Sequence, residues 1–276
     1  GDAKCSVEQR NDLYERAQKQ GYTIARGYDD FVARNKKADK IMLYQKNVAE
    51  EIPYTIDRTT DDLTLAQITK AGIDFLSQKS KKGFFMMVEG GKIDYASHSD
   101  DAATMIHEVL DFNAAIAEAY EFYKRHKDET LIIVTADHET GGIVLGYTGE
   151  YKLNLKALSS QKVSVDKLAT MLKALGSTTW GDIAKIVKEN IGVEPRGGHA
   201  IDEAVEMTNN LANKIANEAI YDLNRKALLS WASGNHSGTF VPLFAIGEDA
   251  DEFNGVIDNT DIPNIIRRIA KLRQKR

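Results

Sequence analysis

Carboxylate and imidazole side chains gather in three short stretches of this sequence. They are the carboxylates Glu89, Asp94 and Asp137 and the imidazoles His98, His138 and His236. Nitrogen and oxygen donors without thiolate suit zinc in a catalytic centre, where one position stays open for water or substrate. Carboxylate together with water suits magnesium. The donor set therefore indicates more than one metal ion.

Two apolar runs are predicted to bring several of these donors to the edge of a sheet. Residues 84–88 read Phe-Phe-Met-Met-Val and end directly before Glu89, and residues 131–134 end just before the Thr-Ala-Asp-His string that holds Asp137 and His138. Continuous apolar runs are typical of strands buried on both faces of an α/β sheet. Such sheets keep their sites at the strand ends. We therefore expect these donors just past the ends of two buried strands.

Asp94 and His98 are four positions apart. If the segment between them is helical, their side chains emerge on one face, one turn apart, and a metal ion could bridge that turn. The pair by itself is also compatible with a solvated helix face, so its meaning comes from the surrounding strings. The histidines His107, His126 and His199 lie outside such strings and are predicted to be structural or surface residues.

Several strings, in the same order along the chain, resemble segments of alkaline phosphatases. Residues 88–94 with His98 are similar to the Glu-Gly-x-x-Ile-Asp-x-x-x-His segment of that family, and residues 135–138 match its Thr-Ala-Asp-His. Residues 236–238 and the apolar residues 241–247 are similar to its closing His-Thr-Gly and the strand behind it. The resemblance implies a layered α/β fold and a phosphatase with bound metals.

The similarity covers about residues 10–147 and 232–270, and residues 62–69 resemble a helix start of the bacterial members in particular. It corresponds only to the carboxyl-terminal part of the family. No serine of this chain has the Asp-Ser-Ala context of the family's nucleophile, and the bridging aspartate, the magnesium-ligand threonine and the phosphate-binding arginine are not matched either. We therefore expect a fragment without a catalytic nucleophile, and little phosphatase activity from residues 1–276 alone.

The resemblance also implies a metal for each of the six donors. It implies a first zinc held by Asp94, His98 and His236, a second zinc held by Asp137 and His138, and a magnesium held by Glu89. Tyr95 stands where family members differ, and it either touches phosphate or its water shell, or packs against its neighbours. The implied reaction is hydrolysis of a phosphate monoester through a phosphoserine. Because zinc ligands must be deprotonated, an alkaline optimum is expected.

Two other functions remain open from the sequence. A phosphodiesterase of the same superfamily would share the Asp-His and Asp-x-x-x-His ligand patterns, although the Glu89 string and residues 62–69 favour the monoesterase. A noncatalytic metal-binding or interaction module would take up zinc without turnover. Comparing hydrolysis of p-nitrophenyl phosphate with hydrolysis of its bis ester separates the monoesterase from the phosphodiesterase.

The composition is typical of a globular protein, with 42% hydrophobic and 28% charged residues in a chain of 276. A net charge of −5 argues against a nucleic-acid partner, and the basic residues after position 266 are predicted to be a solvated helix end. No apolar run reaches the length of a membrane span. The single cysteine, Cys5, cannot form an internal disulfide. A periplasmic or secreted location and a homodimer are expected only through the resemblance.

Helix and strand patterns alternate as expected for a layered sheet with helices on both faces. We predict an α/β core formed by residues 1–149 and 231–276 and a mostly helical insertion at 150–230, which is either lid- or crown-like or plain surface decoration. Strands are predicted at 22–25, 41–44, 84–88, 131–134 and 240–246. Core helices are predicted at 7–20, 64–76 with Asp61 or Asp62 as cap, 101–123 and 262–272. Insertion helices are predicted at 165–174, 180–190 and 200–223, with Gly176 and Gly192 closing the first two.

Overall fold

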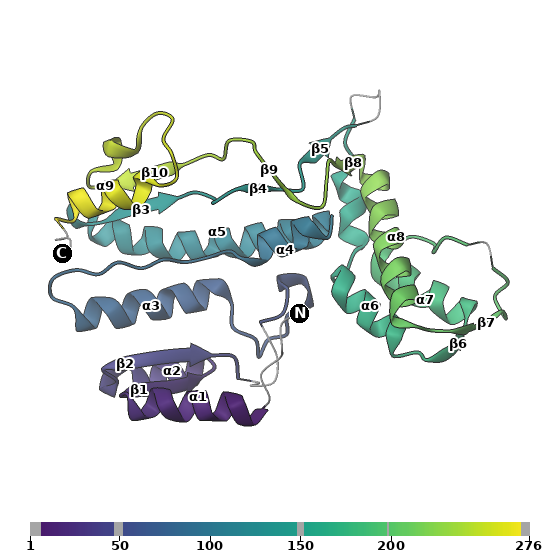
Figure 1. The fold of residues 1–276 in the computed structure, drawn as a ribbon, viewed down its shortest axis with the longest axis horizontal. Helices are drawn as coiled ribbons and strands as arrows, with labels where there is room; N and C mark the ends of the chain where they lie inside the picture. The colour runs from purple at the N-terminus through teal and green to yellow at the C-terminus, as the bar shows by residue number, and fades with distance from the viewer. Residues whose placement is uncertain (1–6, 47–51, 148–151, 198, 272–276) are drawn as a thin grey trace.

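The structure is a computed structural model that describes residues 7–46, 52–147, 152–197 and 199–271. Cys5 and the last basic residues, Arg273, Lys275 and Arg276, lie outside this part of the chain. Figure 1 shows an α/β body from which a helical lobe projects at one end. Within the described residues, no helix is both long and apolar enough to cross a bilayer.

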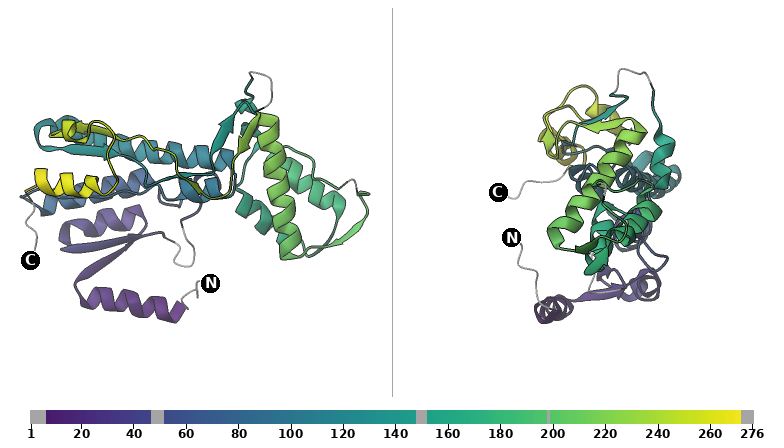
Figure 2. Two further views of the ribbon diagram at one scale, coloured as in Figure 1. Left: turned by 45° about the horizontal axis from the view of Figure 1, so that its top comes forward. Right: turned by 90° about the vertical axis from the view of Figure 1, so that its right-hand side faces the viewer.

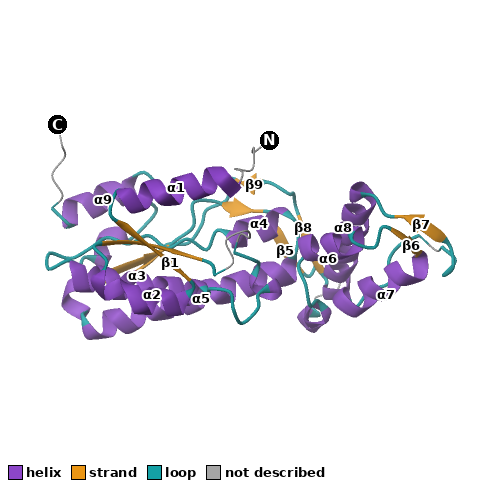
Figure 3. Cartoon of the chain, turned by 90° about the horizontal axis from the view of Figure 1, so that it is seen from below, coloured by secondary structure: helices purple, strands orange, loops and turns teal. Residues whose placement is uncertain are grey.

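The first part of the body is a parallel β-α-β unit. Strands β1 (Tyr22–Arg26) and β2 (Lys40–Tyr44) pair in parallel, and α2 (Tyr28–Arg34) connects them. Helix α1 (Val7–Lys19) lies on the other side of this pair from α2 (Figure 3). Both strands lie where the sequence predicts them. Helices therefore cover both faces of the parallel pair, in agreement with the predicted α/β fold class.

Three helices form the layer that carries the metal-binding candidates. They are α3 (Leu65–Lys79), α4 (Lys92–His98) and α5 (Ala102–Arg125). Helix α3 packs along α5, and α4 packs against the start of α5. The predicted caps of α3 are wrong: Thr64 caps this helix through a capping box with Gln67, and the Asp62 carboxylate instead accepts from Thr59.

A long antiparallel ribbon crosses the body beside α5. It consists of three strand pairs, which are β3 (Leu131–Val134) with β10 (Phe244–Gly247), β4 (Glu139–Thr140) with β9 (His236–Ser237), and β5 (Ile143–Leu145) with β8 (Leu229–Trp231). In Figure 1 the chain runs out along the first strand of each pair and returns along the second. The register places Thr140 opposite His236. Two predicted ligand strings, a hundred residues apart in sequence, therefore lie side by side.

The predicted buried strand at 84–88 is wrong. These residues have no regular secondary structure and no ladder partner among the described residues. The side chains of Phe85 and Met87 are 70% and 76% exposed. An apolar run satisfies the strand pattern, but a strand also needs a neighbour that pairs its backbone groups, and the run alone does not supply one.

The helical lobe, residues 155–227, has a core of its own. Its elements are η4 (Leu155–Ser160), α6 (Val165–Lys173), β6 (Ser177–Thr179), α7 (Trp180–Ile191), β7 (Ala204–Glu206) and α8 (Asn209–Ala227). Leu168, Ile183 and Leu223 are fully buried in it. Ala102 and Ala103 of α5 join the same core, so the lobe is anchored on the first turn of α5. Figure 2 shows the lobe extending away from the body.

The lobe is mostly helical, as predicted, but two details differ. The predicted helix at 200–223 begins only at Asn209, because β7 precedes it and pairs with β6. Gly192 closes α7 in the left-handed conformation as predicted, whereas Gly176 lies three residues beyond the end of α6 at Lys173, and the cap of that helix is Ala174. The domain boundaries at 150 and 230 stay predictions.

Four short 3-10 helices and one carboxyl-terminal helix complete the described chain. They are η1 (Asn35–Lys37), η2 (Thr55–Asp57), η3 (Lys127–Glu129), η5 (Ala250–Phe253) and α9 (Asp261–Ile269). The strand predicted at 240–246 is shorter than expected, because β10 covers only Phe244–Gly247. Helix α9 has Pro263 in its first turn, where a missing backbone N–H costs nothing.

Candidate metal centre

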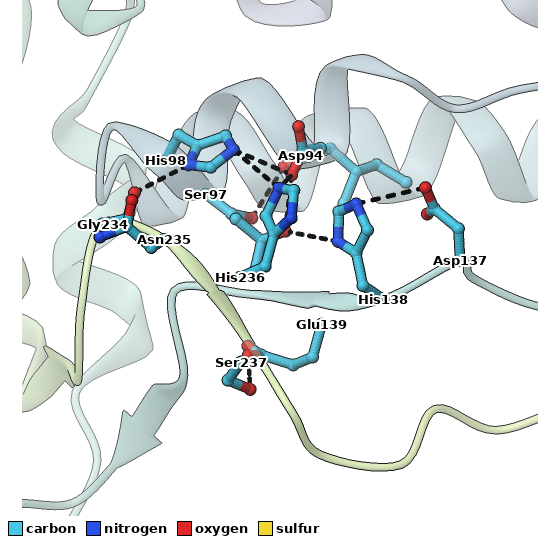
Figure 4. A network of polar contacts seen from close by, with 12 residues as sticks. Asp94, Ser97, His98, Asp137, His138, Glu139, Gly234, Asn235, His236 and Ser237 are labelled. Carbon is cyan, nitrogen blue, oxygen red and sulfur yellow. Dashed lines mark hydrogen bonds and ion pairs between the residues drawn. The ribbon is translucent and has the colours of Figure 1, made fainter.

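Helix α4 and the β4–β9 pair bring three donor side chains together. Asp94 and His98 emerge from the same face of α4, and His236 reaches them from the first position of β9 (Figure 4). Their donor atoms all lie within 4.8 Å of one another. A search of the described residues for three or more His, Cys, Asp or Glu side chains that could hold one ion finds this group.

The distances among the three donor atoms match those around one tetrahedral zinc. His98 Nε2 lies 3.1 Å from His236 Nε2 and 3.4 Å from Asp94 Oδ1, and His236 Nε2 lies 3.5 Å from Asp94 Oδ1. Zinc bonds of about 2.0–2.1 Å at tetrahedral angles place ligand atoms about 3.3 Å apart. The three residues therefore already have the spacing of a ligand set, and a fourth position faces solvent because the donors are 30–48% exposed.

The His98 ring is oriented by the backbone. Its Nδ1 lies 2.8 Å from the carbonyl oxygen of Gly234, which can only accept, so Nδ1 carries the proton. Nε2 then holds a lone pair, and it points at the Nε2 atom of His236. Metal-bound histidines are commonly fixed in this way, with the second ring nitrogen donating to a carbonyl or carboxylate. A cation at this position would be held by the His98 lone pair, and by that of His236 when the His236 proton is on Nδ1.

Thr140 joins the three-donor group to the second predicted ligand pair, and the sequence analysis missed it. Its hydroxyl donates to Asp94 Oδ1 at 2.6 Å and lies 3.3 Å from His138 Nδ1. Since the hydroxyl proton goes to the carboxylate, the oxygen can accept from His138 Nδ1 in the tautomer that carries its proton there. The alternation of side chains along a strand, which puts residues 138 and 140 on the same side, is the signal that could have indicated it.

Asp137 and His138 form a second, two-donor pair. His138 turns Nε2 toward Asp137 Oδ2 at 3.2 Å. The His138 ring also stacks on the ring of His236, with centroids 3.5 Å apart. In the tautomer with the proton on Nδ1, Nε2 and Oδ2 are two acceptors that face each other, and a cation between them would bind both. Asp137 is 85% exposed, so a further ligand can reach this pair from solvent.

Glu139 and Ser237 hold the two ligand-bearing strands together. The Ser237 hydroxyl donates to one Glu139 carboxylate oxygen, and the backbone N–H of Gly142 donates to the other at 2.7 Å. Glu139 therefore fixes β4 against β9 and keeps His138 beside His236. Because both of its carboxylate oxygens already accept a hydrogen bond, we assign Glu139 a structural role.

Glu89 and Tyr95 lie at a neighbouring pocket rather than in the three-donor group. The pocket has a volume of about 290 Å³, and both residues line it together with Lys92 and the ion pair of Arg58 with Asp111, whose side chains are 9% and 15% exposed. The Tyr95 side chain is 58% exposed, and the Lys92 ammonium lies 5.9 Å from its ring. Glu89 therefore lines this pocket and is not one of the three donors that could hold one ion.

Comparison with known proteins decides the family. A family profile described as alkaline phosphatase matches residues 4–272. The chain belongs to the alkaline phosphatase family. The structural observations above can therefore be compared with alkaline phosphatases directly.

Two curated relatives come from Bacillus subtilis. Alkaline phosphatase 4 is 36% identical over 217 residues, which cover 78% of this chain and 45% of that protein. Alkaline phosphatase 3 is 31% identical over 268 residues, which cover 95% of this chain and 55% of that protein. The chain thus spans about half the length of these relatives.

A solved structure supports the same fold. The cold-active alkaline phosphatase from Shewanella sp. superposes with a TM-score of 0.74 and 27% identity, covering 96% of this chain and 62% of that one. The lobe and the body are both included in a match of this extent. The α/β fold class predicted from the sequence is therefore the fold of the family.

The predicted site residues separate into three groups. Asp94, His98 and His236 converge, Asp137 and His138 form a pair beside His236, and Glu89 and Tyr95 line the pocket described above. Two histidines predicted to be structural have other partners: His126 contacts Glu129, and His199 contacts Glu203, each at 2.8 Å. Neither belongs to the three-donor group.

Proposed function

We propose that the protein is a metal-dependent phosphomonoesterase of the alkaline phosphatase type. Family membership supports phosphatase chemistry. The observation that carries the proposal for this chain is the triangle of donor atoms from Asp94, His98 and His236, with sides of 3.1–3.5 Å. These residues would hold one zinc ion.

A second zinc would bind Asp137 and His138, and a magnesium ion would bind Glu89. The carboxylate–imidazole pair supplies two zinc donors and requires further ligands, and an exposed carboxylate beside water suits magnesium. When bound, such ions act as Lewis acids on phosphate oxygens and lower the pKa of a coordinated water. Each assignment can be tested separately by mutation, because each ion has its own proposed ligands.

The charges of the chain explain why an anionic substrate would require these cations. Asp94, Asp137 and Glu89 place three carboxylates on this side of the molecule, and a phosphate monoester is itself a dianion. In a chain of net charge −5, these groups repel the substrate until cations neutralise them. Thr140 and Gly234 hold the Asp94 carboxylate and the His98 ring in place, so little reorganisation is needed at the moment of binding.

The route through a phosphoserine is part of the proposal, and we assign no nucleophile among residues 1–276. The 276-residue chain is accordingly expected to bind zinc with little turnover by itself. Tyr95, which is exposed beside Lys92, is proposed to contact the phosphate or its water shell. The expected substrate is a phosphate monoester, and a periplasmic or secreted location and a homodimer remain expectations from the family.

The test compares two substrates and two metal states. The protein that contains this chain is assayed with p-nitrophenyl phosphate and with bis-p-nitrophenyl phosphate, before and after removal of metal by a chelator. The proposal predicts preference for the monoester and loss of activity with the metal. Preference for the bis ester would favour the phosphodiesterase, and zinc binding without hydrolysis of either ester would favour a noncatalytic metal-binding protein.

A further inference from the structure

The turn that follows His98 is a tightly closed helix end. Asp100 has a left-handed conformation with φ 53°, its N–H donates to the Ser97 carbonyl, and the N–H of Asp101 donates to the Ala96 carbonyl, both at 3.0 Å. These two bonds are the Schellman pattern of a helix carboxyl terminus. Asp101 is therefore fixed relative to the last turn of α4, which carries His98.

Asp101 also begins the next helix. Its side chain accepts from the backbone N–H of Thr104 at 3.1 Å and from the Thr104 hydroxyl at 2.8 Å, which makes it the N-cap of α5. One residue thus ends α4 and starts α5. A change in the hydrogen bonds of the Asp101 carboxylate therefore affects the connection between the two helices.

The helical lobe supplies the other two donors to this carboxylate. Gln161 Nε2 donates to Oδ1 at 2.7 Å, and the backbone N–H of Val165, at the start of α6, donates to Oδ2 at 2.9 Å. Asp101 is only 1% exposed. A buried carboxylate requires its donors, because an unpartnered one would retain the full cost of desolvation. The lobe is therefore needed for Asp101 to keep this position.

Two further contacts link the lobe to the same place. The Asn224 side chain, from α8, donates to the Asp100 carbonyl at 2.7 Å. The chain that leaves α8 passes through β8 and reaches Gly234, whose carbonyl orients the His98 ring. The lobe thus contacts both the turn that ends α4 and the segment that fixes the imidazole.

We propose that Asp101 is a positioning residue that couples docking of the helical lobe to the geometry of the metal-binding face of α4. This inference rests on the metal site proposed above. In the docked lobe, Gln161 and Val165 hold Asp101, which holds the end of α4 and so keeps His98 within reach of Asp94 and His236. The lobe then has a function for the metal site beyond enclosing its own core.

Asp57 provides a matched control in the same interface. Its carboxylate accepts two bonds from the lobe, from the Ser164 N–H at 2.9 Å and from the Ser164 hydroxyl at 2.5 Å. Ser164 directly precedes Val165, so both carboxylates bind the same end of α6. Asp57 lies in η2, and the hydrogen bonds of its carboxylate go to Ser164 rather than to the turn after His98. A variant at Asp57 therefore removes two bonds to this end of α6 and leaves all four donors to Asp101 in place.

The experiment measures zinc affinity of the full chain by competition with a chromogenic chelator. Asp101→Asn is expected to weaken zinc binding by about tenfold or more, as outer-shell changes do, while Asp57→Asn leaves it within about twofold. Gln161→Ala removes one lobe donor and keeps the Thr104 cap, so it tests the same coupling if Asp101→Asn fails to fold. Equal zinc affinity in wild type, Asp101→Asn and Gln161→Ala would overturn the proposal, and so would equal losses in the Asp57 and Asp101 variants.

Hydrogen exchange gives a second readout that a purely structural role would not change. If docking of the lobe favours zinc binding, zinc binding must equally favour docking of the lobe. Zinc should therefore slow exchange of the Val165 and Thr104 amides in the wild type, and this effect should be lost in Gln161→Ala. Exchange that is insensitive to zinc in the wild type would contradict the coupling. Normal coupling together with no hydrolysis of either ester in the assay of the proposed function would leave this inference standing and remove the phosphatase proposal. A wild-type chain that does not bind zinc would remove the metal site and the coupling together.

Discussion

Replacing Thr140 by valine removes one hydroxyl and little else from the metal centre. Valine has nearly the same shape as threonine and suits a strand, so β4 should keep its pairing with β9. The change deletes the 2.6 Å hydrogen bond to Asp94 Oδ1 and the contact to His138 Nδ1. Both Asp94 and His138 then lose the group that orients them.

The expected effect follows from the charge and exposure of Asp94. A hydrogen bond to a charged group contributes about 1.5–3 kcal/mol. Because the Asp94 side chain is 30% exposed and water can replace part of the bond, we take the lower end, about 1.5 kcal/mol, which corresponds to roughly tenfold in affinity. We therefore expect Thr140→Val to weaken zinc binding by about tenfold, in line with other outer-shell ligand partners.

The assay is zinc competition with a chelator at fixed pH, with Thr140→Ser as the control. Serine keeps the hydroxyl and should keep most of the affinity. If the valine variant binds zinc as tightly as the wild type, Thr140 does not orient Asp94 in the bound state. If the serine variant loses as much as the valine variant, the effect comes from packing of the methyl group and the hydrogen-bond argument fails.

Three further predictions concern the ligands, a helix cap and the lobe core. In the full protein, His236→Ala should lower zinc content and phosphatase activity together, because it removes one corner of the donor triangle; unchanged zinc by elemental analysis together with surviving activity would exclude His236 from the site. Thr64→Ala should cost about 1 kcal/mol in urea unfolding, because it removes the N-cap of α3, and a Gln67→Ala loss of similar size would support the capping box. Leu168→Ala should cost about 2–5 kcal/mol, because this side chain is fully buried in the lobe, whereas Leu155→Ala, at 48% exposure, should cost far less; equal losses in thermal unfolding would contradict the described core.

Helices with strong apolar periodicity could be predicted from the sequence. Helices α3, α5, α6 and α7 lie close to their predicted ranges, because the spacing of apolar residues along the sequence is enough to indicate a helix with one buried face. The start of α8 could not be predicted, since residues 204–206 carry a spacing compatible with helix yet pair with β6. Pairing between segments distant in sequence is decided by tertiary contacts, which local patterns do not contain.

The difference between local sequence patterns and tertiary contacts also explains which residues of the site could be predicted. Asp94, His98 and His236 were predicted through strings that resemble a family, and the fold brings them together. Thr140 and Asp101 were not predicted, because their importance lies in hydrogen bonds to residues up to 64 positions away and no local string marks them. The apolar run at 84–88 was predicted as a strand because hydrophobicity indicates burial, but Phe85 and Met87 are exposed among the described residues.

Asp94, His98 and His236 are proposed to form one zinc site. Anomalous diffraction at the zinc edge from crystals of the zinc-loaded protein locates the bound ion. We expect a peak within about 2.0–2.2 Å of Asp94 Oδ1 and of the Nε2 atoms of His98 and His236. A zinc-loaded crystal with no peak among these three atoms, or with zinc bound elsewhere, would refute the proposed site.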